Sequence, residues 1–344
     1  MQMPPSEHGL WHIARIPATT ANLGSGYDTM AMALNQSYWF AYRWSRHDAV
    51  LAVRGVDEQL VPRDPAQHLF FRAATFCSHE LHVDRCPIEL VAVSQAPLRA
   101  GLGSSAAVQL AGILATAQCN GIKLKRDDAF SLLAKIEGHP DNAAAAVHGG
   151  LVVCTSVGGV CRARRLPFTP AVGFQLLIPT YRKVSTEALR ESLPVSVSRS
   201  DAVCNLQCQA MLLAGFASGD TEAISLGCQD RLHQSYRALL MPGVADVLAL
   251  HPGDGFIGAV ISGAGPTMLL MHEFSRPDAC GRALDTFRHH DPGAELKAVT
   301  IADGYCCMYG RNRETDPLSG SFPFVHGCHM GESYVPTPRL RAGH

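Results

Sequence analysis

Residues 97–107 read PLRAGLGSSAA, and they constrain the fold more tightly than any other stretch of the chain. They directly follow the alternating segment IELVAVSQ, and the residues after them place Leu110, Ala111 and Leu114 on one helical stripe. The pattern predicts a glycine-rich turn between a strand and the start of a helix. The free backbone N–H groups at such a helix start carry roughly half a positive charge and favour a phosphate group.

The two serines of this turn add chemistry to the predicted phosphate site. Ser104 and Ser105 supply hydroxyl groups that can bind Mg2+ or contact phosphate oxygens. The turn differs from the GxxxxGK[ST] phosphate-binding loop because it contains no lysine. A simple capping role for Ser104 at the helix start is the alternative interpretation.

Length and composition exclude several classes of protein. The 344 residues suffice for about two domains, and the 47% of hydrophobic residues exclude wholesale disorder. A formal net charge of -1 gives no bulk attraction to nucleic acid or to anionic membranes. No run approaches the roughly 18 apolar residues of a membrane helix, and the first residues do not resemble a secretory signal. We therefore expect a cytoplasmic protein that spans no membrane and binds no nucleic acid.

Two stretches suggest how the chain is divided. Basic residues and prolines separate two apolar segments over 160–173, so we predict a domain boundary near residue 168. Residues 311–344 lack periodicity and are rich in glycine, proline and arginine, which is typical of a loosely held extension. The predicted division is an N-terminal domain over 1–168, a C-terminal domain over 169–310 and an extension over 311–344.

Two further glycine-rich turns carry polar residues. Residues 16–28 read IPATTANLGSGYD, in which Asn22 and Asp28 can hydrogen-bond a hydroxyl or an amine substrate. A plain strand-to-helix connection is the alternative for this stretch. Residues 261–268 read ISGAGPTM between two strand-like segments, and this turn is equally compatible with packing and with ligand contact.

A polar elbow follows the helix predicted over 127–138. Gly138 ends that helix, so Glu137 falls on its last turn, where the helix dipole disfavours a carboxylate. Such a position indicates a cation partner, with a solvated glutamate as the alternative. His139 and Asp141 follow in the connecting turn, where ordinary turn chemistry is the competing explanation. Together the three residues would suit Mg2+ and an amine.

Three more polar residues are candidates for the site because of the motifs that contain them, and not because of their spacing. Thr186 and Arg190 are four residues apart and share a helical face, and Arg237 ends the segment DRLHQSYR. A single arginine of this kind is most often solvated, so spacing alone assigns it no role.

The three glycine-rich motifs in this order resemble the kinase superfamily that includes galactokinase, homoserine kinase, mevalonate kinase and phosphomevalonate kinase. The resemblance spans about residues 12–305. Within it, EGHPDN, VSTEALRESLP, VSRSDAVCNL and DRLHQSYR look specifically like the homoserine kinase branch. The resemblance implies an α+β fold of two domains, an N-terminal domain like that of a ribosomal protein and a C-terminal ferredoxin-like domain. It further implies ATP-dependent phosphorylation of L-homoserine to O-phospho-L-homoserine in threonine biosynthesis, and a homodimer.

The same resemblance implies the nucleotide and metal sites. Ser105 and Glu137 would hold Mg2+, with Ser104 as the alternative to Ser105, and Asn22, Ser105 and Glu137 would be the catalytic residues. The ATP-binding loop would comprise Pro97, Leu98, Arg99, Ala100, Gly101, Leu102, Gly103, Ser104, Ser105, Ala106 and Ala107.

The resemblance implies that the remaining candidate residues bind homoserine. Asn22 and Asp28 would reach the substrate, and Asp141, with His139 nearby, would take its amino group. The substrate carboxylate would be held by Thr186, Arg190 and Arg237.

The chain departs from the family pattern at Met32, where the motif usually has glycine, and at AAAAV in place of a proline-containing NVAPA form. Neither departure removes a ligand-bearing residue, so both bear on packing and acceptor fit. The alternatives are a superfamily kinase with another hydroxyl acceptor and a retired kinase that only binds nucleotide.

Overall fold

The computed structural model describes residues 10–181 and 185–309, and the structure below is that of these residues. Within helices and strands, the side chains of Thr186, Glu187, Met308 and Tyr309 are also outside the description. The predicted extension over 311–344 therefore lies outside the described residues.

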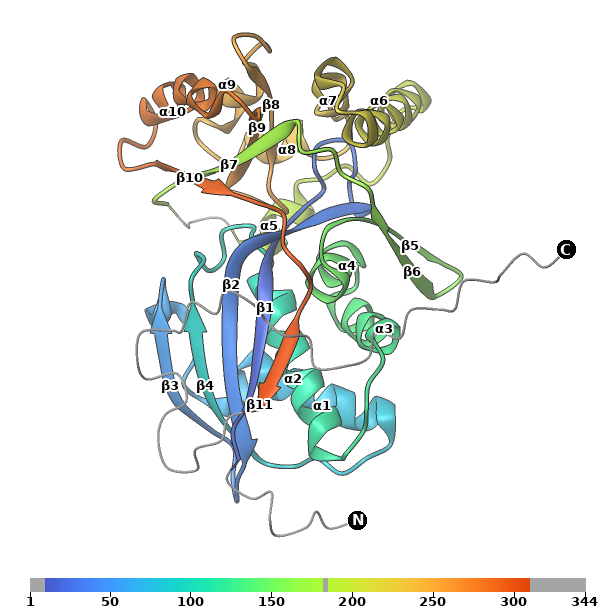
Figure 1. Ribbon diagram of the computed structural model, residues 1–344, viewed down its shortest axis with the longest axis vertical. Helices are drawn as coiled ribbons and strands as arrows, with labels where there is room; N and C mark the ends of the chain where they lie inside the picture. Colours follow the sequence, from blue (N-terminus) through green and yellow to red (C-terminus); the bar gives the residue numbers. More distant parts are fainter. Residues whose placement is uncertain (1–9, 182–184, 310–344) are drawn as a thin grey trace, which may run out of the picture.

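A mixed seven-stranded sheet forms the first layer of the molecule (Figure 1). The long strand β2 lies at its centre, since its first residues pair with β5 and its second half pairs with β4, while β1 runs along its other edge. The sheet order is β11-β1-β2-β4-β3, with β5 and β6 branching from β2. The strands are β1 (His12–Ala21), β2 (Met30–Trp44), β3 (Ala49–Gly55), β4 (Ile88–Ser94), β5 (Leu151–Val157), β6 (Val160–Leu166) and β11 (Cys306–Tyr309).

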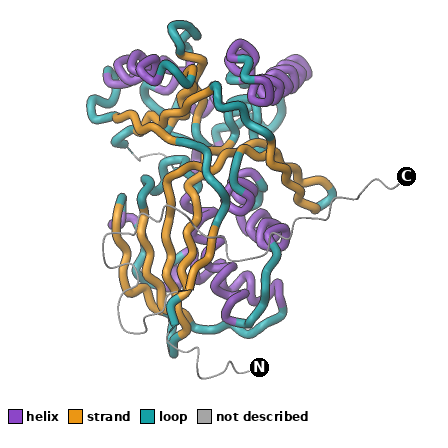
Figure 2. The backbone as a smooth tube through the Cα atoms, viewed as in Figure 1, coloured by secondary structure: helices purple, strands orange, loops and turns teal. Residues whose placement is uncertain are grey.

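Four helices pack on one face of this sheet, and Figure 2 shows them as a separate layer behind the strands. The helix α2 is buried over most of its length because it lies between the sheet and the helices α1 and α3. Its many alanines permit this close packing on all sides. The helices are α1 (Leu69–Leu81), α2 (Ser104–Cys119), α3 (Arg126–Glu137) and α4 (Asp141–His148), with short 3-10 turns η2 (Glu58–Leu60) and η3 (Pro65–Gln67) before them.

The second sheet has four antiparallel strands in the order β10-β7-β9-β8. Its strands are β7 (Val172–Ile178), β8 (Phe256–Ile261), β9 (Met268–Glu273) and β10 (Glu295–Val299). The accompanying helices are α5 (Thr186–Glu191), α6 (Arg199–Ser218), α7 (Thr221–Gly227), α8 (Gln234–Ala238), α9 (Val244–Leu248), α10 (Gly281–Arg288) and the 3-10 turn η4 (Pro277–Cys280). The α+β class is confirmed by these two sheets with their helices.

The chain crosses from the first sheet to the second between β6 and β7, and its last described strand returns. Residues 306–309 form β11, which pairs with β1, although the predicted division places them in the C-terminal domain. A strand far along the chain can pair with the free N–H and C=O groups at the edge of β1, and local sequence patterns do not reveal such a pairing. We propose a division near residue 168 in which β11 belongs to the first domain.

The apolar core is continuous from the first sheet to one face of the second, and a separate cluster fills the other face of the second sheet. Met32, the residue that departs from the family motif, is fully buried in β2 opposite Thr20 and Leu151. It is therefore a core residue and not part of the cavity described below. No helix in the described part of the chain is long and apolar enough to cross a membrane.

Candidate functional site

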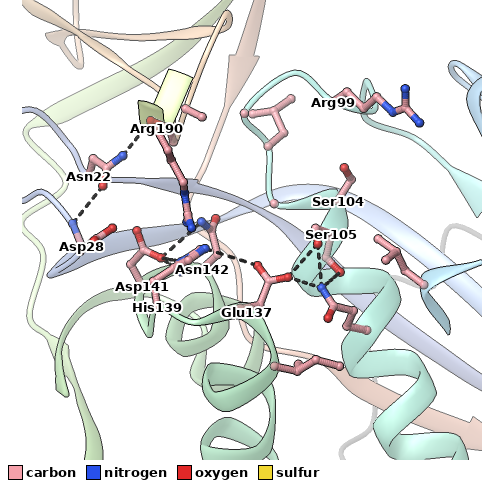
Figure 3. A pocket seen from close by; sticks show the side chains of 18 of the residues that line it. Asn22, Asp28, Arg99, Ser104, Ser105, Glu137, His139, Asp141, Asn142 and Arg190 are labelled. Carbon is pink, nitrogen blue, oxygen red and sulfur yellow. Dashed lines mark hydrogen bonds and ion pairs between the residues drawn. The ribbon is translucent and has the colours of Figure 1, made fainter. Parts of the chain in front are cut away.

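A cavity of about 510 Å³ lies where the two sheets meet and where the three glycine-rich motifs converge. Ser105 and Glu137 lie on one side of it, Asn22 and Asp28 on the other, and His139 and Asp141 lie between them (Figure 3). The residues singled out from the sequence that line it are Asn22, Asp28, Arg99, Gly101, Leu102, Gly103, Ser104, Ser105, Glu137, His139, Asp141, Arg190 and Arg237. Those that do not line it are Pro97, Leu98, Ala100, Ala106 and Ala107, while the side chain of Thr186 lies outside the described residues.

The loop over 97–103 leads into α2 with its backbone in conformations that favour glycine. Gly101 has φ 79° and Gly103 has φ 68°, and Gly103 is the N-cap residue of α2. Ser104 is the first helical residue, and no side-chain cap bond is made at this end. The alternative that Ser104 acts as a simple cap is therefore wrong. Ser104 and Ser105 line the cavity, and no side chain caps the first N–H groups of α2.

Close packing between the three motifs explains why two of these positions cannot carry a side chain. A Cβ at Gly101 would lie 2.1 Å from the carbonyl oxygen of Ser262, and one at Gly103 would lie 1.9 Å from Thr19 Oγ1. Ser262 Oγ donates a hydrogen bond to the Gly101 carbonyl at 2.8 Å. The Gly263 N–H donates to the Ala21 carbonyl at 3.0 Å. The third motif therefore combines the two alternatives left open for it, because it packs against the other two and also lines the cavity.

The carboxylate of Glu137 meets the start of α2. Ser105 Oγ donates to Glu137 Oε1 at 2.7 Å, although 32 residues separate them in sequence. Gln109 donates from Nε2 to Ser105 Oγ at 2.7 Å and also to Glu137 Oε1. No motif in the sequence singles out Gln109, and its spacing of four residues from Ser105 on the same helix is the one indication of this contact. Among residues 10–181 and 185–309, the recorded ion pair of Glu137 is with His139, at 3.8 Å.

The polar elbow after α3 forms a compact anionic centre. As predicted, Gly138 ends the helix in a left-handed conformation. His139 Nδ1 donates to Asp141 Oδ1 at 2.7 Å, and that oxygen also accepts from the Asn142 N–H at 2.6 Å. One ligand atom each from Asp28, His139 and Asp141 lies within 4.8 Å of the others.

The electrostatics of this centre follow from burial and from two neighbouring carboxylates. Burial raises the pKa of Asp28, and the charge of Asp141 raises it further. Burial alone would lower the pKa of His139, but the hydrogen bond and charge of Asp141 and the charge of Glu137 outweigh it and raise the pKa. The charges of Asp141 and Glu137 thus favour the protonated form of His139, and the charge of Asp141 disfavours a second carboxylate charge on Asp28. Such a site favours a cationic group on a ligand.

Asn22 connects the first motif to the third. It has a left-handed backbone with φ 73°, its Nδ2 donates to the Gly263 carbonyl at 2.7 Å, and its Oδ1 accepts from the Asp28 N–H at 3.0 Å. The carboxamide keeps one N–H and one lone pair for a ligand. The structure therefore holds Asn22 rigidly in the cavity wall, on the same side as Asp28.

Arg237 supplies a buried positive charge at the same end of the cavity. It is only 2% exposed, and its Nη1 donates to the Gly263 carbonyl at 2.9 Å while its Nε donates to the Leu189 carbonyl at 3.3 Å. Its guanidinium carbon lies 5.4 Å from the centre of the Tyr27 ring. Across the described ranges, no carboxylate is recorded in an ion pair with it. Arg190 is exposed and lines the same cavity from α5.

A second cavity of about 380 Å³ adjoins the first and was not foreseen from the sequence. Its walls are mostly apolar and come from β2, β3, β4, α2 and the segment over 60–69, and it shares Leu69, Arg99, Ser104 and Ser105 with the first cavity. His68, which caps α1, lines it and is 2% exposed. Its Nδ1 accepts from the Phe70 N–H at 3.2 Å, so Nε2 carries the proton. That N–H has no hydrogen-bond partner within the described part of the chain.

Comparisons with known proteins agree on one family. Residues 68–150 match the model of the GHMP kinases N terminal domain. The homoserine kinase of Solibacter usitatus is 34% identical over 296 residues, which cover 85% of this chain and 95% of that relative. A homoserine kinase of Thermus thermophilus is 35% identical over 295 residues, covering 84% of this chain and 96% of the relative.

The fold of the chain also matches a solved structure. The crystal structure of homoserine kinase from Cytophaga hutchinsonii superposes with a TM-score of 0.74 at 24% identity, covering 90% of this chain and 99% of that one. At this level of identity the match supports the fold that the sheets and helices already display.

Proposed function

The chain belongs to the homoserine kinase family of the GHMP kinases, and from this premise we propose that it transfers the γ-phosphoryl group of ATP to the side-chain hydroxyl of L-homoserine. The observation that carries the proposal is the order of groups along the cavity. The start of α2 with Ser105 and Glu137 lies on one side, Asn22 and Asp28 lie on the other, and Asp141 lies between them, while the buried Arg237 shares the Gly263 carbonyl with Asn22. The partial positive charge of the helix start suits the phosphates of the donor. The carboxylates suit the ammonium group of an amino-acid acceptor, and the arginine suits its carboxylate.

We assign the nucleotide to the two adjoining cavities. The phosphates would lie against the N–H groups of the loop over 97–103 and the start of α2, where partial positive charge favours them without a lysine. The base would occupy the second cavity, whose apolar walls suit an aromatic ring. There the unpartnered N–H of His68 is available to a ring nitrogen of the base.

The residues near Ser105 fit Mg2+. This ion prefers oxygen ligands and usually binds through one or two carboxylates together with substrate phosphates. Glu137 offers a carboxylate and Ser105 a hydroxyl, already 2.7 Å apart beside the start of α2. These two residues would hold the ion, which would neutralise charge on the transferring phosphoryl group when bound.

We assign homoserine to the other half of the cavity. The ammonium group would lie against Asp141 and Asp28, whose shared negative charge contributes to the raised pKa of Asp28. The carboxylate would lie against Arg237, a buried cation with no recorded carboxylate partner in the described chain, and against Arg190 at the cavity mouth. Asn22 would then orient the hydroxyl group toward the phosphates.

The chain's contribution to catalysis in this proposal is positioning and charge stabilisation. Phosphoryl transfer passes through a loose transition state, so alignment of the hydroxyl with the γ-phosphoryl group supplies much of the acceleration. The hydroxyl oxygen forms the new bond to phosphorus, the bond to the ADP oxygen breaks, and the hydroxyl proton leaves to a phosphate oxygen. A homodimer and a cytoplasmic location stay predictions from the sequence.

A coupled assay of ADP release tests the proposal across acceptors. Homoserine, mevalonate, shikimate, galactose and a blank without acceptor should be compared with MgATP at saturation. We expect stimulation above the blank by homoserine alone. Stimulation by a neutral polyol in place of homoserine would refute the assignment of the arginines, and no stimulation by any acceptor would favour a retired kinase.

A further inference from the structure

His233 is a fully buried histidine whose two ring nitrogens both have partners. Its Nε2 lies 2.9 Å from the Gly24 carbonyl oxygen, and its Nδ1 lies 3.3 Å from Nη1 of Arg237. Its ring also stacks on Tyr27, with centroids 5.1 Å apart. Neither the sequence patterns nor the comparisons assign this residue a role.

The partners determine the protonation of the ring. A carbonyl oxygen can only accept a hydrogen bond, so Nε2 must carry the proton, and a guanidinium can only donate, so Nδ1 must be bare. The ring is therefore the neutral Nε2–H form. Burial lowers the pKa of His233 to about 4, which agrees with this form at neutral pH.

The two partners belong to different parts of the homoserine site. Gly24 lies in the turn between Asn22 and Asp28, and a Cβ there would lie 2.8 Å from the Cys228 carbonyl oxygen, so the turn has no room to shift toward that segment. Arg237 lies one helical turn after His233, on α8. The imidazole thus connects the turn that presents Asn22 to the arginine that faces the cavity.

We propose that His233 is a positioning residue for the homoserine site, which holds Arg237 and the turn over 22–28 in one fixed arrangement. The proposal rests on the proposed function, because it assumes that Arg237 binds the substrate carboxylate. This role explains why the hydrogen-bond acceptor beside Arg237 is a neutral imidazole nitrogen. A carboxylate there would neutralise the guanidinium and compete with the substrate, and a protonated imidazole would repel it.

The charged groups around the ring are consistent with this role. Asp230 lies 3.8 Å from Nε2, but its carboxylate accepts from the N–H groups of Leu232, His233 and Gln234 and so is occupied at the start of α8. Its charge therefore stabilises the backbone that carries His233 and does not displace the Gly24 carbonyl from Nε2.

Three variants distinguish the two hydrogen bonds of the imidazole, one to Gly24 and one to Arg237. His233→Asn places a carboxamide atom near the position of Nδ1, so it keeps an acceptor for Arg237 and loses the bond to Gly24. His233→Gln reaches the position of Nε2, so it keeps the donor to Gly24 and loses the acceptor. His233→Leu loses both. His272→Leu is the matched control, because His272 is a buried histidine of β9 whose Nδ1 lies 2.7 Å from a backbone carbonyl and which does not line the cavity.

Steady-state kinetics with homoserine and ATP varied separately give the test. We expect His233→Leu to raise KM for homoserine by about 10-fold or more with KM for ATP within about two-fold of wild type, as for loss of a bond to a charged group. His233→Gln should mainly raise KM for homoserine. His233→Asn should mainly lower kcat, because the turn that carries Asn22 loses its support.

Two results would overturn the inference. One is equal change in KM for both substrates, and the other is a set of variants that match His272→Leu in kinetics and differ only in melting temperature. If the proposed function itself were wrong, wild-type protein would release no ADP in response to homoserine. That outcome is visible before any variant is made, so the two failures can be told apart.

Discussion

Replacing Arg237 with alanine should remove most of the binding of the substrate carboxylate while leaving the nucleotide site intact. Arg237 lines the cavity beside Asn22, with which it shares the Gly263 carbonyl, and is 2% exposed, so solvent screens its charge poorly. Its loss also leaves the Leu189 carbonyl and Nδ1 of His233 without one donor each, whereas the Gly263 carbonyl keeps the Nδ2 of Asn22. The free energy of unfolding should therefore fall by about 1–3 kcal/mol for each group left without its partner.

The effect on homoserine binding is separate from the effect on folding and follows from the loss of one charge partner of the carboxylate. Truncating one partner of a buried, hydrogen-bonded charge pair costs about 2–5 kcal/mol, and each 1.4 kcal/mol is about tenfold in affinity. Because the exposed Arg190 still faces the cavity, we expect the lower to middle part of that range. KM for homoserine should rise by roughly 100-fold, with KM for ATP nearly unchanged.

A substrate without the carboxylate makes this prediction specific. The compound 3-aminopropan-1-ol is homoserine without that group, so wild-type enzyme should use it with a kcat/KM lower by roughly 100-fold. In the Arg237→Ala variant the preference for homoserine should become much smaller, and what remains of it should come from Arg190. Arg276→Ala is the control, because Arg276 pairs with Asp278 on the surface and does not line the cavity.

The reasoning would be refuted if Arg237→Ala kept the wild-type preference for homoserine over 3-aminopropan-1-ol. It would also be refuted if the variant lost activity with both acceptors equally while unfolding in urea like the wild type.

Three further predictions concern the metal, the loop and pH. Glu137→Ala should lower kcat by about 100-fold or more and raise the Mg2+ concentration needed for half-maximal rate, and a kcat near wild type would contradict the metal assignment. Gly103→Ala should lower the melting temperature and raise KM for ATP, because the new Cβ would lie 1.9 Å from Thr19 Oγ1 at a φ of 68°; unchanged thermal unfolding would contradict this. Burial opposes the charge on His139, but Asp141 outweighs it and raises the pKa of His139 above 6.5 in the folded state. The protonated ring therefore stabilises the fold fully below pH 6.5, and this stabilisation is lost as the pH rises through the folded-state pKa. Urea unfolding should therefore show a larger difference between wild type and His139→Gln at about pH 5.5 than at about pH 8.5, and the reverse order would refute the assignment.

Local patterns in the sequence were sufficient for the elements that position the site. The glycine-rich turn before α2 and the end of α3 at Gly138 both follow from residues adjacent to them, because glycine at positive φ and helix periodicity are local properties. The resemblance to a kinase family predicts that Ser105 and Glu137 lie in one site. Their spacing of 32 residues does not predict this contact.

The features that escaped prediction depend on long-range packing. The second cavity is assembled from β2, β3, β4, α2 and the segment over 60–69, so no single stretch of sequence contains it. The pairing of β11 with β1 joins the two ends of the described chain. The burial of His233 between Gly24 and Arg237 likewise requires the fold, since 209 residues separate its ring from the Gly24 carbonyl in sequence.

The most direct test of the central claim is identification of the phosphorylated product. Wild-type protein should be incubated with MgATP and L-homoserine, and the product examined by 31P NMR before and after treatment with hydroxylamine. The account predicts a phosphate monoester on the side-chain oxygen, O-phospho-L-homoserine, which hydroxylamine leaves intact. A hydroxylamine-sensitive acyl phosphate would mean that the carboxylate, and not the hydroxyl, faces the nucleotide. That result, or a spectrum with no homoserine-dependent product, would contradict the account.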